Sequence, residues 1–86
     1  VVIDLYADWC APCRMLAPIL KQVAEEKSKD AIVYKVNTDH NRDIAARFNV
    51  SGIPYVVFIK NGKLVNALTG LYPKEAYKKM IDTHSK

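Results

Sequence analysis

The sequence has little of three features on which whole classes of protein depend: long apolar runs, charge of one sign, and cysteine. Its 86 residues contain no apolar run near the roughly 18 residues that a membrane-spanning helix needs. The net charge is only +4, and lysines and arginines are interleaved with acidic residues instead of forming the basic stripe of a nucleic-acid-binding surface. We therefore expect a protein that binds neither membranes nor nucleic acids.

What the chain does have is the composition of an ordinary globular domain. Hydrophobic residues make up 50% and charged residues 26%, without low-complexity tracts or internal repeats. A chain of this length forms one compact core, so we expect a single domain over residues 1–86. It opens on an apolar run without a signal-peptide pattern, and we expect a cytoplasmic protein. An exported or periplasmic one is the alternative if residues upstream of Val1 carry a signal.

Hydrophobic periodicity and turn residues predict the order of helices and strands. Apolar β-branched runs indicate strands, helical spacing indicates helices, and a proline, aspartate or asparagine marks where a helix begins. The predicted elements are a strand at 1–7, a helix of about 16 residues from Pro12 to the region of 28–30, a strand at 31–37, a short helix capped by Asp39 or Asn41 with Ile44 and Phe48 on its buried side, strands at 55–59 and 63–69, and a helix opened by Pro73.

The connections between these elements predict the topology of the sheet. A strand, a helix and a strand form a βαβ unit, whose two strands run parallel. Asn61-Gly62 between two apolar runs is the strongest short signal for a tight antiparallel hairpin. The predicted fold is therefore α/β, with a mixed four-stranded central sheet and helices on both faces.

The two cysteines, Cys10 and Cys13, lie three positions apart at the start of the first predicted helix, where their side chains are neighbours on one face. One alternative is a structural staple, but in the chain-entropy model so short a loop stabilises a fold by only about 2 kcal/mol. Another is a zinc site completed by His40 and His84, but their spacing matches no compact zinc module. We interpret both histidines as surface residues, and the cysteine pair as a redox site.

Helix geometry predicts different roles for the two thiols. Unpaired N–H groups and the helix dipole favour a thiolate, the reactive form of cysteine, at a helix N-terminus. Cys10 lies at the helix start, where we expect it to be exposed beside Trp9, and Cys13 lies one turn deeper. Cys10 is therefore predicted to attack a disulfide and Cys13 to resolve the resulting mixed disulfide.

Asp4 interrupts the apolar strand that runs into the cysteines. A buried carboxyl group has a raised pKa, and we predict that Asp4 exchanges a proton with Cys13, directly or through a water. The alternative is a core acid whose hydrogen bonds are satisfied. Lys35 interrupts the neighbouring strand in the same way, and an ion pair with Asp4 would explain both residues. The alternative for Lys35 is a lysine at a strand end that reaches solvent.

With these residues in place, the sequence resembles the thioredoxin family over nearly its whole length. WCAPC at residues 9–13 is similar to the family's active-site signature, Asp4 to its buried acid and Lys35 to the partner that tunes this acid. Pro18 matches the proline that kinks the active-site helix. The resemblance implies a thioredoxin-like fold that lacks the usual N-terminal strand and helix, which leaves the strand at 31–37 with a bare edge.

The resemblance also implies a substrate-binding surface. Ile53-Pro54 corresponds to the family's loop whose proline is cis and faces the disulfide, and the backbone of Ile53 would pair with an extended substrate segment. Ala11 replaces the more usual glycine between the cysteines, a difference that bears on the redox potential, and Tyr55 stands where thioredoxins usually carry threonine. The other members of this surface would be Trp9, Ala11, Pro12 and Gly70.

Together these features predict a protein-disulfide reductase that works through Cys10 and Cys13. It would hold no cofactor or metal and act as a monomer on disulfide-containing proteins. An upstream reductase such as a thioredoxin reductase would then reduce it again. The alternative is a thioredoxin-like module of a larger exported or membrane-tethered protein that acts as an oxidant, an isomerase or a docking domain.

Overall fold

The computed structural model describes residues 1–85, and its helices and strands follow the predicted order. The elements are β1 (Val2–Tyr6), α1 (Ala11–Glu26), β2 (Val33–Asn37), α2 (Arg42–Arg47), β3 (Tyr55–Lys60), β4 (Lys63–Thr69) and α3 (Lys74–His84). α1 has 16 residues, and α3 begins directly after Pro73. None of the helices in this described part of the chain is long and apolar enough to span a membrane.

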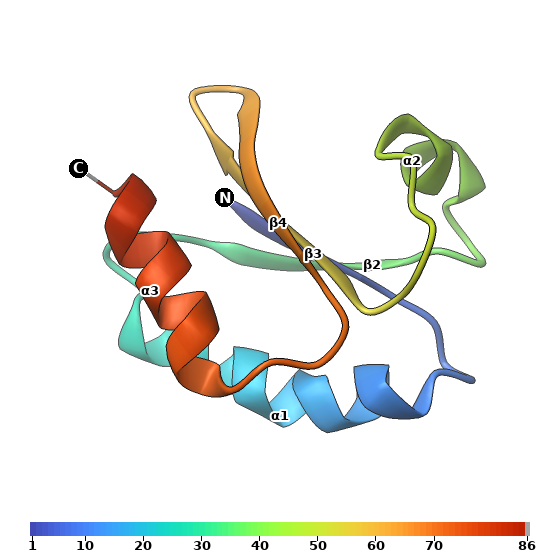
Figure 1. Cartoon of the computed structure of the whole chain (residues 1–86), viewed down its shortest axis with the longest axis horizontal. Coiled ribbons are helices and arrows are strands. Elements are labelled where there is room, and N and C mark those ends of the chain that lie inside the picture. Colours follow the sequence, from blue (N-terminus) through green and yellow to red (C-terminus); the bar gives the residue numbers. More distant parts are fainter. Residues whose placement is uncertain (86) are drawn as a thin grey trace.

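The strands form one sheet in the order β2-β1-β3-β4, the central layer of Figure 1. β1 and β2 pair in parallel, with Asp4 opposite Lys35, as expected for a strand–helix–strand unit. β1 pairs antiparallel with β3, and β3 pairs antiparallel with β4. The predicted mixed sheet is therefore confirmed.

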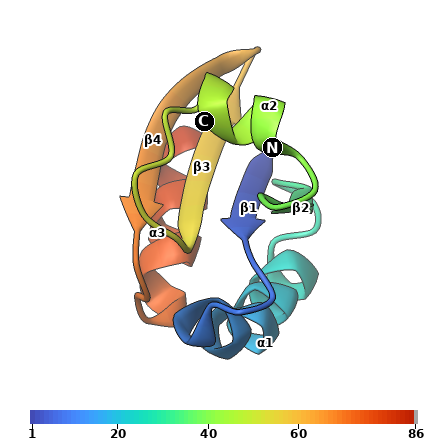
Figure 2. The ribbon, with the colours of Figure 1, turned by 90° about the vertical axis from the view of Figure 1, so that its right-hand side faces the viewer.

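Helices cover both faces of the sheet. In Figure 1, α1 lies below the sheet, α3 at its left and α2 at its upper right, and in Figure 2 α2 lies in front of the strands and α3 behind them. The main core fills the space between the sheet and the pair α1 and α3. Its buried side chains are Val2, Leu16, Leu20, Val23, Val56, Phe58, Tyr77 and Ile81. This packing fixes α1 against the sheet and so holds the turn between β1 and α1, which carries the cysteines.

The predicted Asn61-Gly62 turn closes the hairpin of β3 and β4. The two residues have φ angles of 54° and 77°, and two-residue turns between right-twisted strands need positive φ at both positions. Asparagine and glycine adopt such angles more readily than other residues. From this turn the two strands pair antiparallel, beginning with Lys60 opposite Lys63 and ending with Tyr55 opposite Thr69.

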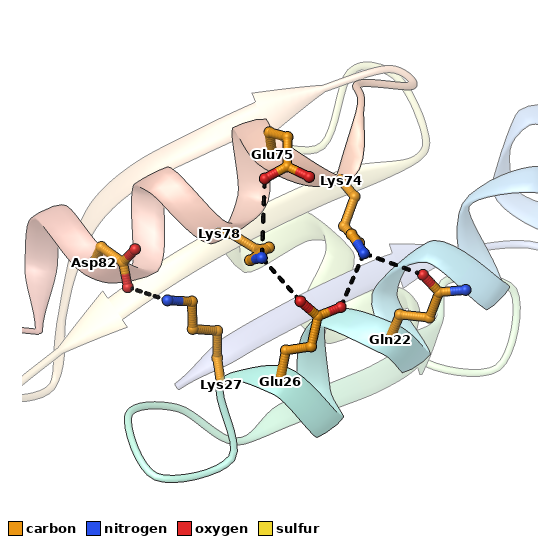
Figure 3. Close-up of polar contacts among 7 residues, drawn as sticks. All are labelled: Gln22, Glu26, Lys27, Lys74, Glu75, Lys78 and Asp82. Carbon is orange, nitrogen blue, oxygen red and sulfur yellow. Dashed lines mark hydrogen bonds and ion pairs between the residues drawn. The ribbon is translucent and has the colours of Figure 1, made fainter.

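The C-terminal end of α1 is tied to α3 by ion pairs at the surface (Figure 3). The Glu26 carboxylate accepts hydrogen bonds from Lys74 at 2.9 Å and from Lys78 at 2.8 Å. Lys27 and Asp82 form a further pair at 2.7 Å. These contacts add to the apolar packing of the two helices, so this end of α1 is held by charge as well as by burial.

Two expectations about local structure need correction. The strand predicted at 31–37 begins only at Val33. The first residue of β1, Val2, pairs with Val33, so residues 31 and 32 have no β1 residue opposite them. Ile44 in α2 and Phe48 at its C-cap are only partly buried, and α2 contributes no fully buried side chain.

Candidate active site

The two cysteines lie where the chain turns from β1 into α1. Cys10 is the N-cap of α1 and Cys13 lies one turn into the helix. They form a disulfide, with their Cα atoms 5.2 Å apart. The backbone N–H of Cys13 donates to Cys10 Sγ at 3.2 Å. Because the first N–H groups of a helix lack intrahelical partners, this position stabilises negative charge on the sulfur of Cys10.

The expected exposure of Cys10 is wrong. In the disulfide, Cys10 and Cys13 expose only 5% and 4% of their surface. Both are buried in a small apolar cluster with Ala7, and Tyr6 and Ile53 pack against this cluster. What distinguishes the two cysteines is therefore their position relative to the helix N-terminus and not their exposure.

Trp9 lies at the surface next to the disulfide and is 69% exposed. Its indole Nε1 donates to Asp39 Oδ2 at 2.9 Å, and the backbone N–H of Asp39 donates to Asn37 Oδ1 at 2.9 Å. These bonds orient the Trp9 ring from the turn that follows β2. Ala11 and Pro12 are exposed in the first turn of α1, so apolar groups also line this side of the site.

A second loop, which connects α2 to β3, packs against the cysteine cluster through Ile53. Figure 2 shows this loop running from α2 toward the N-terminal turn of α1. The peptide bond between Ile53 and Pro54 is cis. Pro54 is fully buried, whereas Ile53 is half-buried. The backbone N–H of Gly70, just after β4, donates to the Pro54 carbonyl at 2.8 Å, so three segments distant in sequence meet here.

Asp4 is buried within β1, with 1% of its surface exposed. Its Oδ1 has no hydrogen-bond partner among residues 1–85. Burial raises the pKa of Asp4 from its ordinary value of 3.8 to about 6, against the opposing charge of Lys35. Asp4 is therefore not a fully satisfied core acid, and it can gain or lose a proton near neutral pH.

Lys35 lies opposite Asp4 in the parallel ladder, but the two do not form the expected ion pair. No ion pair in the described part of the chain joins them. The Lys35 ammonium group instead lies over the Tyr6 ring, 4.7 Å from its centroid, in an exposed position. A long lysine side chain keeps its charge hydrated in this way while its stem covers the sheet. The charge still acts on Asp4 through space and lowers its pKa.

The two histidines differ in burial. His40 is exposed, as expected, whereas His84 at the end of α3 is partly buried, which corrects the expectation of a surface residue. The buried Nε2 atom of His84 has no hydrogen-bond partner in the described chain. Within residues 1–85, no three His, Cys, Asp or Glu side chains come together as a potential metal site.

The structure adds two residues to the site that the sequence analysis missed. The sequence indicates Asp39 only as a possible helix cap, yet its side chain holds Trp9. Tyr77 is only one position of the predicted helix after Pro73, yet its hydroxyl group contacts the segment that follows β4. Neither contact follows from hydrophobic periodicity or from a motif, because each depends on how separate segments meet in the fold.

A disulfide that closes so short a loop adds little to stability, so its use to the protein is chemical: it opens and closes. The fold and the cysteine pair at the helix N-terminus define a thiol–disulfide oxidoreductase. The family model described as Thioredoxin matches residues 1–83, and the chain belongs to the thioredoxin family.

Thioredoxins of distant organisms are similar to this chain. It is 40% identical over 84 residues to the thioredoxin of Chlorobaculum thiosulfatiphilum, an alignment that covers 98% of this chain and 78% of that one. It is 42% identical over 85 residues to thioredoxin-T of Drosophila melanogaster, covering 99% of this chain and 54% of that one. Among solved structures, a mutant thioredoxin of Halobacterium salinarum NRC-1 matches with a TM-score of 0.93 at 36% identity, covering 99% of this chain and 74% of that one. The predicted family, fold and dithiol–disulfide exchange are thus confirmed.

Proposed function

We propose that this protein reduces disulfides in other proteins, with Cys10 as the nucleophile and Cys13 as the resolving thiol. The observation that carries this assignment is the Cys13 backbone N–H, which donates to Cys10 Sγ at 3.2 Å at the N-cap of α1. In the reduced protein the same donor and the helix dipole stabilise a thiolate at Cys10. Cys13 lies a turn further from the helix end, where the dipole is weaker.

The first half of the reaction is attack by the Cys10 thiolate on one sulfur of the substrate disulfide. A bond forms between Cys10 Sγ and that sulfur, and the second substrate sulfur leaves as a thiolate. The product is a mixed disulfide between the protein and its substrate.

The second half of the reaction needs a base for Cys13. The Cys13 thiol gives its proton to the Asp4 carboxylate, directly or through a water, and its thiolate attacks Cys10 Sγ. The mixed disulfide breaks, the substrate leaves with two more electrons, and the Cys10–Cys13 disulfide forms. A carboxyl group with a pKa of about 6 is suited to this step, and the charge of Lys35 tunes that pKa by lowering it.

We also propose that an extended substrate segment pairs with the backbone of Ile53. Within residues 1–85, the backbone hydrogen bonds of the loops leave the amide and carbonyl of Ile53 unused. The residue packs on the cysteine cluster and is half-buried, which supports pairing by β-augmentation next to the disulfide. The remaining members of the proposed surface are Trp9, Ala11, Pro12, Pro54 and Gly70.

The substrates are disulfide-containing proteins, and we propose that an upstream reductase such as a thioredoxin reductase restores the dithiol. The reducing direction supports a cytoplasmic location, because thiols stay reduced there. We also propose that the protein acts as a monomer and that residues 1–86 form a single domain, because one sheet and one main core organise the described residues. Equilibration with mixtures of reduced and oxidised glutathione measures the reduction potential of the Cys10–Cys13 pair. A potential above that of ordinary protein disulfides would contradict the proposal that the protein reduces its substrates.

The role of each cysteine is tested by trapping the mixed disulfide. Reduced Cys13→Ser protein mixed with insulin should accumulate a covalent adduct through Cys10, because nothing remains to resolve it. Cys10→Ser protein should form no adduct and reduce insulin no faster than dithiothreitol alone. Non-reducing electrophoresis and mass spectrometry give the yield of adduct. An adduct that forms only in Cys10→Ser would reverse the assignment.

A further inference from the structure

Tyr77 has an unusual place for a polar side chain. It lies in α3, exposes 0% of its surface and belongs to the main core. Its hydroxyl group accepts the backbone N–H of Tyr72 at 3.2 Å and donates to the carbonyl of Gly70 at 3.4 Å. One hydroxyl group therefore engages both ends of the segment 70–72, which leads from β4 to α3.

This segment is connected to the cis-proline loop. The backbone N–H of Gly70 donates to the carbonyl of Pro54 at 2.8 Å. Gly70 has a φ of 95°, in the left-handed region that favours glycine, so its peptide groups take an orientation that other residues adopt with strain. Hydrogen bonds thus run from Tyr77 to Gly70 and from Gly70 to Pro54, next to the residue that packs on the disulfide cluster.

The hydroxyl group is not needed to fill the core, because a phenylalanine ring would occupy the same volume. A buried hydroxyl group is tolerated when it is hydrogen-bonded, and here both bonds go to the backbone of one exposed loop. Burial raises the pKa of the Tyr77 phenol above its ordinary value, although the hydrogen bond from Tyr72 opposes this and the charge of Asp4 adds to it, so the phenol keeps its proton. That one proton is donated to Gly70.

We propose that Tyr77 is a positioning residue for substrate docking: its hydroxyl group fixes the segment 70–72 and, through Gly70, the Pro54 carbonyl, and so sets the surface on which a protein substrate lies. This inference rests on the proposed substrate role of Ile53, Pro54 and Gly70. Tyr77 itself touches neither substrate nor cysteine. Removing its hydroxyl group therefore weakens the binding of protein substrates and leaves the sulfur chemistry unchanged.

The test compares Tyr77→Phe with the wild type under turnover, with dithiothreitol as reductant and insulin at varied concentration. Loss of hydrogen bonds that hold the surface should raise KM for insulin by roughly three- to tenfold, with kcat unchanged. Reduction of oxidised glutathione, which is too small to use this surface, should keep its wild-type rate. The matched control Tyr34→Phe removes a hydroxyl group from the exposed face of β2, at the edge of the sheet, and should change neither quantity.

A further variant separates this inference from the proposed substrate surface. Trp9→Ala removes an exposed ring of that surface and should also raise KM for insulin. If Trp9→Ala raises KM and Tyr77→Phe does not, the inference about Tyr77 is wrong and the surface stands. If neither raises KM, both are wrong. An equal loss of rate on insulin and on glutathione in Tyr77→Phe would likewise contradict a docking role.

Amide hydrogen exchange tests the contact in the wild type, independently of how the variant folds. Tyr72 has an exposed side chain in a loop, yet its amide should be protected from exchange because it donates to the buried hydroxyl group. Tyr77→Phe should abolish this protection. Unprotected exchange of the Tyr72 amide in the wild type would overturn the inference.

Discussion

Two carboxyl groups of this molecule, Asp4 in β1 and Glu26 at the C-terminal end of α1, are shifted in opposite directions by their surroundings. Asp4 is buried, with one oxygen unpartnered among the described residues, and its pKa is raised to about 6. Glu26 lies at the surface between the ammonium groups of Lys78 and Lys74, and hydrogen bonds from these groups lower its pKa to about 2 (Figure 3). The same functional group thus titrates near neutral pH in one place and only in strong acid in the other.

This difference in pKa bears on the proton transfer that we propose between Cys13 and Asp4. Glu26 keeps its charge at every physiological pH, so it contributes to the contact between two helices and cannot exchange protons. Ionised Asp4 lowers stability, but it can exchange a proton at the pH where thiols react. The fold thus tolerates the destabilising carboxyl on the strand that leads into the cysteines, and places the stabilising one at the far end of α1.

The largest expected effect on stability is that of Asp4→Asn. The folded-state pKa of Asp4 lies above its ordinary value, so the native protein loses stability as pH rises from about 4 to about 6 and stays less stable above that range. Replacing the acid with a neutral isostere should raise the free energy of unfolding by up to about 3 kcal/mol at pH 7 and by almost nothing at pH 3. Urea unfolding across this pH range measures the gain. Asp30→Asn, which changes an exposed carboxyl group, is the matched control.

The same Asp4→Asn variant should slow turnover at neutral pH by roughly tenfold or more, because Cys13 loses its base when the mixed disulfide is resolved. Single-turnover reduction of insulin measures the rate. If the protein gains stability and reacts at the wild-type rate, Asp4 is a costly core residue without a part in the chemistry.

The sequence predicts those parts of the structure that short patterns encode. The Cys10–Cys13 spacing, the acid that interrupts an apolar strand, and the Asn61-Gly62 turn each have a local physical cause, so the order of elements and the redox pair follow from the sequence. The parallel pairing of β1 and β2 follows from the helix between them.

What the sequence could not predict depends on packing between distant segments. Cys10 is buried because it packs with Ala7 and Cys13 and because Ile53, from a distant loop, covers this cluster. No local sequence pattern predicts such a contact. Lys35 is opposite Asp4 in register, yet its long side chain lies over the Tyr6 ring. Strand register does not predict this position, because a lysine side chain is long enough to keep its charged group in water.

Lys35→Met should have an intermediate effect, visible mainly in the pH dependence. Because the charge of Lys35 lowers the Asp4 pKa, its removal should move the acid-side inflection of the single-turnover rate to higher pH. Lys35→Arg keeps a charge at this position and should preserve the wild-type profile. Coincident profiles for Lys35→Met and the wild type would show that Lys35 does not tune the reaction.

The smallest expected effect is that of Glu26→Gln. The folded-state pKa of Glu26 lies below its ordinary value of 4.5, so its stabilising contribution is present above that value and is lost as pH falls toward about 2. The variant should therefore be slightly less stable than the wild type at pH 7 and equally stable at pH 2. The difference at pH 7 should shrink in high salt, because surface ion pairs are screened.

Glu75→Gln is the matched control. It removes a more exposed carboxyl group whose distance to Lys78 is 3.9 Å, and it should change stability less. Both variants should reduce insulin at the wild-type rate. A slower rate in Glu26→Gln would mean that the two ends of α1 are coupled, and the contrast between a chemical and a structural carboxyl group would fail.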